Sequence, residues 1–207
     1  MEKVGLRSFL FLNCLEPQLA AWFGTGGAEP ALKPGVGALW VEVFPGGAIV
    51  RLMDVALKAT TCRPALLEMA GPYGWLVVVD EDLGQVQAAG EAILEYLGCR
   101  EEDRLPPRIT TQEIIRGVEG QHCRLLNQEP RGQLVVQGES LFLLETDPAP
   151  WAALGGNEAE KAASIKLIGL KIAGDYGRLL LAGSEAEIDA AAQAALSRLA
   201  PLAGMAP

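Results

Sequence analysis

The feature that most constrains this chain is an internal repeat with an offset of 103 residues. Residues 70–79 read AGPYGWLVVV and residues 173–182 read AGDYGRLLLA, so that each begins with a glycine-flanked tyrosine and continues as an apolar run. Solenoid and propeller repeats recur every 20–50 residues or so, far more often than this. A chain of 207 residues instead has room for two domains of about 100 residues each. The repeat therefore predicts a domain duplication.

The similarity extends upstream of the tyrosine stretches. ALWVEV at 38–43 matches SLFLLE at 140–145, and the large apolar residues of both are typical of a strand. DVALKA at 54–59 matches NEAEKA at 157–162. The first of these belongs to a predicted helix, because apolar residues recur on one helical face. That face consists of Ile49, Leu52, Met53, Ala56 and Leu57.

Downstream, residues 83–98 and 184–199 read as two alanine-rich helices with one apolar stripe each. The first stripe contains Val86, Ala89, Ile93, Leu94 and Leu97, and the second contains Ile188, Ala191, Ala192, Ala195 and Leu199. Ser184 and Glu187 have the spacing of a capping box. Asp82 is a candidate N-cap and Gly98 a candidate helix end. Each copy thus has the order strand, helix, strand, glycine loop, strand, helix.

The charged stretch CREEDRLPPR at 99–108 ends in two prolines, which is typical of a linker. We therefore predict one domain over 1–103 and a second over 104–207. Each copy also opens with a less similar leader segment. The predicted fold class is α+β, with one domain present twice in tandem.

Charge and hydropathy exclude two classes of partner. A net charge of −9 argues against nucleic acid, whose binding depends on Lys and Arg neutralising phosphates. Half of the residues are hydrophobic, yet no uninterrupted apolar run approaches the roughly 18 residues of a membrane span. The N-terminal stretch has no signal-peptide cleavage site, so the expected location is the cytoplasm.

No catalytic, metal or cofactor site is expected. The four cysteines contain no C-x-x-C pair, which favours buried reduced thiols. His122 is the only histidine and lies in a polar run typical of a surface. The glycine clusters at 24–27 and 34–37 have neither Walker nor Rossmann spacing and are predicted to be turns. The chain is therefore not expected to be an enzyme.

Long stretches of the chain resemble the bacterial microcompartment shell domain in its tandem, trimeric form. They are similar above all to the branch, known from carboxysomes and some catabolic compartments, whose trimers can stack face to face. The stretches that carry this resemblance are LRSFLFLNCLEPQLAAWFGT at 6–25, PGVGALWVEVFPGGAIVRLMDVALKA at 34–59, RITTQEIIRG at 108–117, RGQLVVQGESLFLLETDPAPWAAL at 131–154, NEAEKAA at 157–163 and GRLLLAGSEAEIDAAA at 177–192.

The resemblance implies two circularly permuted shell domains, each a ferredoxin-like type of α/β sandwich. It also implies a homotrimeric, pseudohexameric tile, single or stacked in pairs, that joins other shell proteins and lets small metabolites through a central pore. Residues at the edge of the tile would be Lys58, Arg63 and Lys161. Residues lining the pore would be Met69, Ala70, Gly71, Pro72, Tyr73, Ala173, Gly174 and Asp175.

Two positions depart from that branch, in which the loop of the first repeat carries a Glu-Arg pair interpreted as a pore gate. Ala70 and Gly71 stand there, so we expect a pore that no such ion pair closes, with Gly71 and Gly74 making the loop mobile. Asp175 adds either a ring of negative charge near the axis or merely a turn cap. The alternative function is that of a soluble regulatory protein that binds a small molecule between its two domains.

Overall fold

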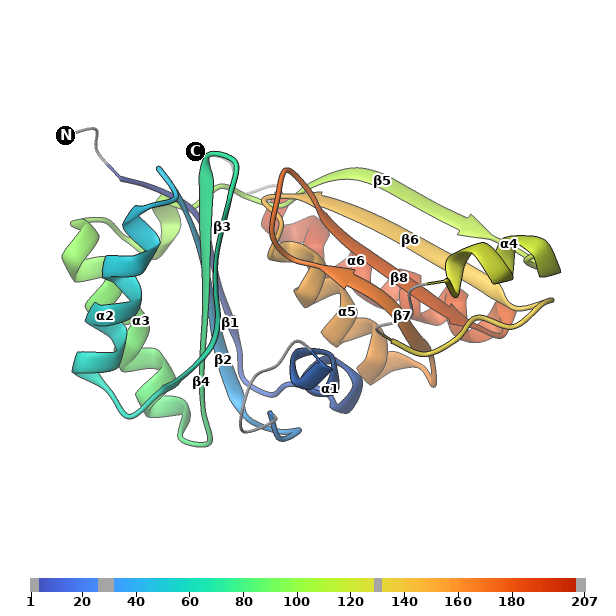
Figure 1. Ribbon diagram of the computed structural model, residues 1–207, viewed down its shortest axis with the longest axis horizontal. Helices are drawn as coiled ribbons and strands as arrows, with labels where there is room; N and C mark the ends of the chain where they lie inside the picture. Colours follow the sequence, from blue (N-terminus) through green and yellow to red (C-terminus); the bar gives the residue numbers. More distant parts are fainter. Residues whose placement is uncertain (1–3, 26–31, 129–131, 204–207) are drawn as a thin grey trace. The chain divides into compact units, whose positions relative to one another are not determined.

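The computed structural model describes residues 4–25, 32–128 and 132–203 (Figure 1). The chain forms two compact units. Unit 1 consists of Met1–Pro106 together with Ala173–Asp175, and unit 2 consists of Pro107–Ile172 and Tyr176–Pro207. The domain limits at 103 and 104 drawn from the sequence stay a prediction.

Unit 1 is built on a four-stranded antiparallel sheet in the order β1-β2-β4-β3. Its strands are β1 (Gly5–Leu12), β2 (Gly37–Phe44), β3 (Arg63–Ala70) and β4 (Tyr73–Asp80). Its helices are α1 (Pro17–Thr25), α2 (Ala48–Ala59), α3 (Leu83–Leu97) and the short 3₁₀ turn η1 (Glu101–Asp103). Helices α2 and α3 cover one face of this sheet, which we call the helical face (Figure 1).

Unit 2 repeats this plan in the strand order β5-β6-β8-β7, again antiparallel throughout. Its strands are β5 (Arg108–Ile115), β6 (Ser140–Asp147), β7 (Lys166–Lys171) and β8 (Gly177–Gly183). Its helices are α4 (Gly120–Leu126), α5 (Trp151–Ala162) and α6 (Glu185–Ala203). The predicted α+β class and the predicted duplication are confirmed.

The apolar stripes predicted for the helices pack against the sheets. In unit 1 the buried side of α2 and α3 meets Leu39, Val41 and Val43, the alternate residues of β2 that face the helices. Leu57, Leu94 and Leu97 are only partly buried, at the margin of this core. In α6 all five predicted stripe residues are buried. A helical period of apolar residues therefore identified the correct faces in both units.

The predicted helix ends are confirmed as well. Asp82 accepts a hydrogen bond from the backbone N–H of Gly84 at the start of α3, and Gly98 ends that helix in the left-handed region at φ 63°. Ser184 and Glu187 exchange hydrogen bonds at the start of α6, as a capping box requires.

The leader segments form a strand and a helix in both units, β1–α1 and β5–α4, which the sequence comparison did not predict. Their connections are held alike. Leu15 and Val118 each accept a hydrogen bond of 2.9 Å from a glycine N–H, donated by Gly35 and Gly138. Both glycines have φ of 89°, a backbone conformation that favours glycine. The predicted turn at 34–37 is thereby confirmed. In the cluster at 24–27 the prediction of a turn is wrong for Gly24 and Thr25, which belong to the last turn of α1, and residues 26 and 27 lie outside the described residues.

The four cysteines are free thiols, but they are not all buried as expected. Cys62 and Cys123 are buried, whereas Cys14 and Cys99 are half-buried. Cys14 lies between β1 and α1, and Cys99 follows the end of α3, so both lie at element ends rather than in a helical stripe or a strand. Burial raises the pKa of the Cys62 thiol, which keeps it protonated.

Candidate functional site

The first candidate pore loop is the tip of the β3–β4 hairpin. Ala70 pairs with Tyr73, so Gly71 and Pro72 alone form the turn. Gly71 has φ of 57°, a conformation that a two-residue hairpin turn requires and that glycine adopts at little cost. Met69, Gly71 and Pro72 are exposed, while Tyr73 is half-buried. The tip is therefore a short, tightly paired turn.

The second candidate loop has a different shape despite its similar sequence. β7 ends at Lys171 and β8 begins at Gly177, so residues 172–176 form an irregular loop in which Gly174 has φ of 105°. Ala173 is buried and Asp175 is exposed. Among the described residues, the Asp175 carboxylate makes no hydrogen bond or ion pair, so it does not act there as a turn cap.

Gly74 and Gly177, which follow the two tyrosines, do not serve loop mobility. A Cβ on Gly74 would lie 2.2 Å from the carbonyl oxygen of Gly46, and one on Gly177 would lie 2.0 Å from that of Ala149. Both glycines therefore let the strand pass close to the turn that precedes α2 or α5. The expectation that Gly74 loosens the first loop is wrong. The glycine of the repeated Tyr-Gly pair has a packing role within each domain.

A buried ion pair supports the first loop, and sequence reasoning missed it. Arg7 on β1 donates to the carboxylate of Glu42 on β2 across 2.5 Å, and Glu42 is fully buried. The guanidinium of Arg7 also lies 3.9 Å from the centre of the Tyr73 ring, at cation–π distance. Phe44 and Trp75 contact the same ring edge to face. The sequence signal was the single carboxylate within the apolar run ALWVEV.

The matched carboxylate of unit 2 is held differently. Glu145 accepts hydrogen bonds from the Thr111 hydroxyl at 2.7 Å and from the Arg178 guanidinium at 2.6 Å. These bonds, the one from Thr111 first, lower the pKa of Glu145 below its usual 4.5. Thr110 occupies the position of Arg7, so the second loop has no counterpart of the arginine that stacks on Tyr73.

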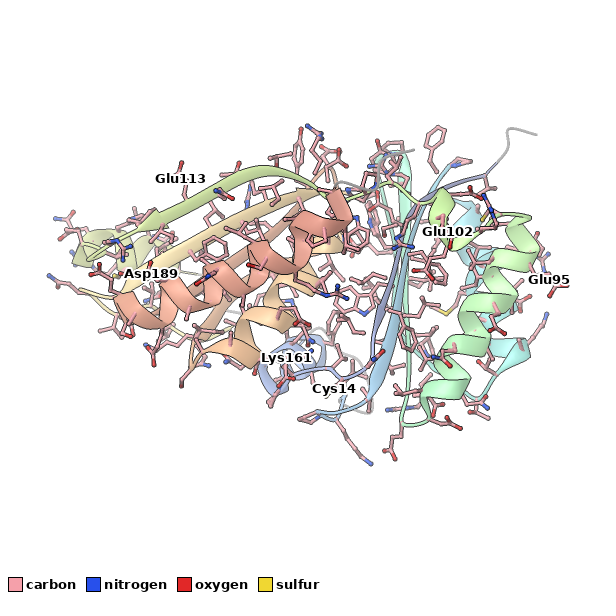
Figure 2. All side chains as sticks on the ribbon, turned by 180° about the vertical axis from the view of Figure 1, so that it is seen from behind. Cys14, Glu95, Glu102, Glu113, Lys161 and Asp189 are labelled. Atoms are coloured by element: carbon pink, nitrogen blue, oxygen red, sulfur yellow. The ribbon has the colours of Figure 1, made fainter. Side chains whose placement is uncertain are left out.

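The candidate edge residues lie at matched places. Lys58 is in the last turn of α2 and pairs with Asp54 at 2.8 Å, and Lys161 is in the last turn of α5 and pairs with Glu158 at 2.9 Å. The hydrogen bond from Lys58 holds the pKa of Asp54 below its usual value. Arg63 begins β3 and is half-buried. Figure 2 labels Lys161.

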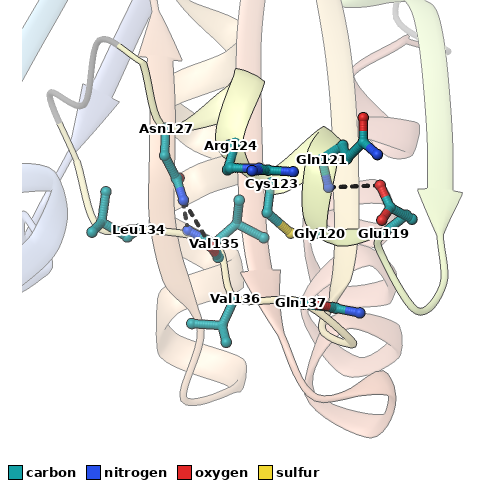
Figure 3. A pocket seen from close by; sticks show the side chains of 10 residues that line it. All are labelled: Glu119, Gly120, Gln121, Cys123, Arg124, Asn127, Leu134, Val135, Val136 and Gln137. Atoms are coloured by element: carbon teal, nitrogen blue, oxygen red, sulfur yellow. Dashed lines mark hydrogen bonds between the residues drawn. The ribbon is translucent and has the colours of Figure 1, made fainter.

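The described surface of unit 2 also has a hollow of about 520 Å³ between α4 and residues 134–137 (Figure 3). Its lining mixes the apolar side chains of Leu134 and Val136 with the polar ones of Gln121 and Arg124. Asn127 closes one side through hydrogen bonds with the backbone of Val135. His122 is exposed, as predicted. Within residues 4–25, 32–128 and 132–203, no three His, Cys, Asp or Glu side chains gather as metal ligands would.

Comparison with known proteins identifies the family. Residues 6–103 match the family model of the CsoS1D N-terminal domain. The chain is 41% identical over 201 residues to the carboxysome shell protein CcmP of Synechococcus elongatus, covering 97% of this chain and 94% of the relative. It is 41% identical over 193 residues to the carboxysome shell protein CsoS1D of Hydrogenovibrio crunogenus, covering 93% of this chain and 94% of the relative. The chain belongs to this family of carboxysome shell proteins.

Two solved structures share the whole fold. The fused permuted hexameric shell protein MSM0275 of the RMM microcompartment superposes with a TM-score of 0.92 at 40% identity, over 97% of this chain and 98% of that one. The double-ringed trimeric shell protein MSM0271 of the same compartment superposes with a TM-score of 0.90 at 34% identity, over 95% of this chain and 96% of that one. Both units are therefore permuted shell domains, as the resemblance implied.

Because the chain belongs to this family, it is a structural shell protein and not an enzyme. It also decides against the alternative of a regulatory protein that binds a small molecule between its domains. Across the part of the chain that the structure describes, no helix combines the length and the apolar character needed to cross a bilayer.

Proposed function

We propose that this shell protein forms a homotrimeric, pseudohexameric tile with a pore for small metabolites on its threefold axis. Three chains would bring six similar domains around the axis, since each chain contributes two. The observation that carries this proposal is the duplication itself: both units have one strand order, and their glycine turns recur with the offset of 103 residues. The trimeric and hexameric names of the two similar structures support it.

The proposed pore is lined by the two loops, at Met69 to Tyr73 and at Ala173 to Asp175. Since Ala70 and Gly71 carry no charge, no Glu-Arg pair can close it. The exposed Asp175 side chain would place three carboxylates near the axis of a trimer. A ring of like charge disfavours anions and favours cations or neutral polar solutes.

Lys58, Arg63 and Lys161 are proposed to lie at the margin of the tile, where it meets further shell proteins. Lys58 and Lys161 support this because they end matched helices, and their side chains are 73% and 42% exposed. Because each of three chains contributes two matched lysines, the same chemistry would recur at six positions around the tile.

Light scattering at micromolar concentration tests the tile. We expect three times the chain mass of 21.9 kDa for a single tile, or six times for a stacked pair. A stable monomer would overturn the proposal.

The pore is tested by Asp175→Asn in assembled shells, with Glu95→Gln as the control. Glu95 is exposed on α3, so its variant removes the same charge away from both loops (Figure 2). We expect an anionic dye to enter Asp175→Asn shells several times faster than unmodified shells, and Glu95→Gln shells at the unmodified rate. Equal entry in all three would contradict the assignment of Asp175 to the pore.

A further inference from the structure

Unit 1 has a groove of about 500 Å³ between α3 and the edge strand β1, which we call the α3 groove. Its floor is apolar and includes Phe9 and Phe11 from β1, Leu39 from β2 and Leu94 from α3. Its volume lies within the range of roughly 300–1,000 Å³ that is typical of ligand sites. Every residue that lines it belongs to unit 1, so the groove is a feature of that unit alone.

The floor contains an aromatic ring that lies directly against α3. A Cβ on Gly90 would lie 2.7 Å from Cζ of Phe9, so any larger residue there would push the ring away. The second repeat has Ala192 at the matched position of α6 and Gln112 in the place of Phe9. The aromatic floor is therefore a difference between the two units and not part of what they share.

The rim of the α3 groove is acidic. Glu91 on α3 and Glu101 on η1 are both exposed, and no lysine or arginine is among the lining residues. Glu101 pairs with Arg104 at 2.6 Å, whereas the Glu91 carboxylate makes no hydrogen bond or ion pair among the described residues. Glu95 and Glu102, labelled in Figure 2, are exposed beside them in the sequence. An apolar floor next to an unpaired carboxylate suits an occupant that has an apolar body and a cation.

Unit 2 fills the matched place with a cation of its own. Arg116, directly after β5, pairs with Glu185 at 2.8 Å and with Asp189 at 2.9 Å, both of which belong to α6. In the first repeat, Asn13 stands at the position of Arg116, and Gln87 of the α3 groove stands at that of Asp189. Neither is charged, so the two cannot form the ion pair that joins sheet edge and helix in unit 2.

We propose that the α3 groove binds a segment of another protein that presents a large apolar side chain next to a lysine or an arginine. The apolar side chain would lie over Phe9 and Phe11, and the cation would pair with Glu91. A protein source fits because the cation at the matched place of unit 2 is itself an arginine side chain. The net charge of −9 disfavours a second copy of this acidic chain as that source.

Peptide selection on the full chain tests this preference. A phage library of random twelve-residue peptides is first depleted on the Glu91→Arg variant and then selected on the unmodified protein. We expect the retained peptides to be enriched several-fold in lysine or arginine close to a large apolar residue. Retention of no peptide, or of peptides without that enrichment, would overturn the inference.

The most enriched peptide is then synthesised with a fluorescent label, and its affinity is measured by anisotropy. Glu91→Arg should weaken binding at least tenfold, because it places a like charge beside the cation of the peptide. Phe11→Ala should weaken it about fivefold or more, because it removes apolar floor. The matched controls in unit 2 are Gln193→Arg on α6 and Ile114→Ala on β5, both at exposed positions. We expect both controls to bind within twofold of the unmodified protein.

Three outcomes of this measurement would overturn the inference. Equal weakening by Gln193→Arg would show a general effect of charge, and unweakened binding to Phe11→Ala would place the peptide elsewhere. Displacement of the peptide by micromolar phenethylamine would show a site for small amines rather than for a protein segment. Circular dichroism melts check that each variant folds, and Leu94→Ala, with the same expected effect, replaces Phe11→Ala if that variant does not.

Light scattering separates this inference from the proposed function. The unmodified protein and Glu91→Arg should have the same mass, because the groove is not required for the tile. Peptide binding by a protein that is monomeric would support the groove and overturn the tile. A trimer that retains no peptide would overturn the groove alone.

Discussion

The two units have the same topology but use their matched residues differently. Both place a glycine after the loop tyrosine, and both hold the leader turn by hydrogen bonds from Gly35 or Gly138. Yet the loop of unit 1 is a two-residue turn beneath a stacked arginine, while that of unit 2 is an irregular segment around Gly174. The glycines that hold these turns are therefore duplicated, whereas the two loops differ in shape and in the side chains that support them.

The largest expected effect tests the glycines that both units place after the loop tyrosine. Gly74→Ala and Gly177→Ala should each destabilise the protein by about 3 kcal/mol or more, because the added Cβ would overlap backbone atoms that cannot move away. Gly47→Ala is the matched control, since nothing lies within 4 Å of its added Cβ. Urea unfolding at fixed protein concentration measures all three. If Gly74→Ala lowers the free energy of unfolding and Gly177→Ala does not, the two turns are not equivalent.

The next effect tests the difference between the matched carboxylates. Arg7→Ala should cost about 3 kcal/mol, because Glu42 is fully buried beside it. Arg178→Ala should cost only about 1 kcal/mol, because Arg178 is 59% exposed and Glu145 keeps its bond from Thr111. Chemical unfolding compares the two variants. Equal losses of unfolding free energy would show that the first loop is not more firmly supported than the second.

A smaller effect concerns pH. The pKa of Glu145 is lowered in the folded protein, so the stability it contributes is present above its unfolded value of 4.5. That contribution is lost as the pH falls through the lower folded value. Glu145→Gln should therefore flatten the decline of the melting temperature below pH 4.5, while leaving the rest of the profile similar. If the melting temperature of Glu145→Gln declines below pH 4.5 as in the unmodified protein, other carboxylates determine that decline.

The smallest effect on stability is expected at the proposed tile edge. Lys58→Ala with Lys161→Ala should shift the melting temperature by no more than about 1–2 °C, because exposed ion pairs contribute little. Trimer mass should not change. Electron microscopy should nevertheless show fewer extended sheets, and unaltered sheet formation would remove both lysines from the edge.

Much of the fold follows from the sequence because helices and caps are local. The stripe from Ile188 to Leu199 and the capping box at Ser184 depend on residues at most four positions apart, so periodicity and spacing identify them. The loop sequences, by contrast, gave no sign that the two loops differ in shape. That difference depends on where β7 stops pairing with β8, which is a property of the sheet and not of the loop residues.

The candidate site was less accessible to sequence reasoning for the same physical reason. The ion pair of Arg7 and Glu42 joins residues 35 positions apart, and only the register of β1 on β2 brings them together. The packing role of Gly74 depends on contact with Gly46. The pore and edge residues are proposed to act between chains, and contacts between chains depend on surfaces that no spacing within one sequence specifies.

The two units are proposed to occupy equivalent positions around one axis, and a cryo-electron microscopy reconstruction of the assembled protein tests this arrangement most directly. We predict three chains in a ring with pseudo-sixfold symmetry, in which the Gly71 and Gly174 loops alternate around a central opening. A map with either loop far from the axis, or with chains joined by a twofold contact alone, would contradict the account.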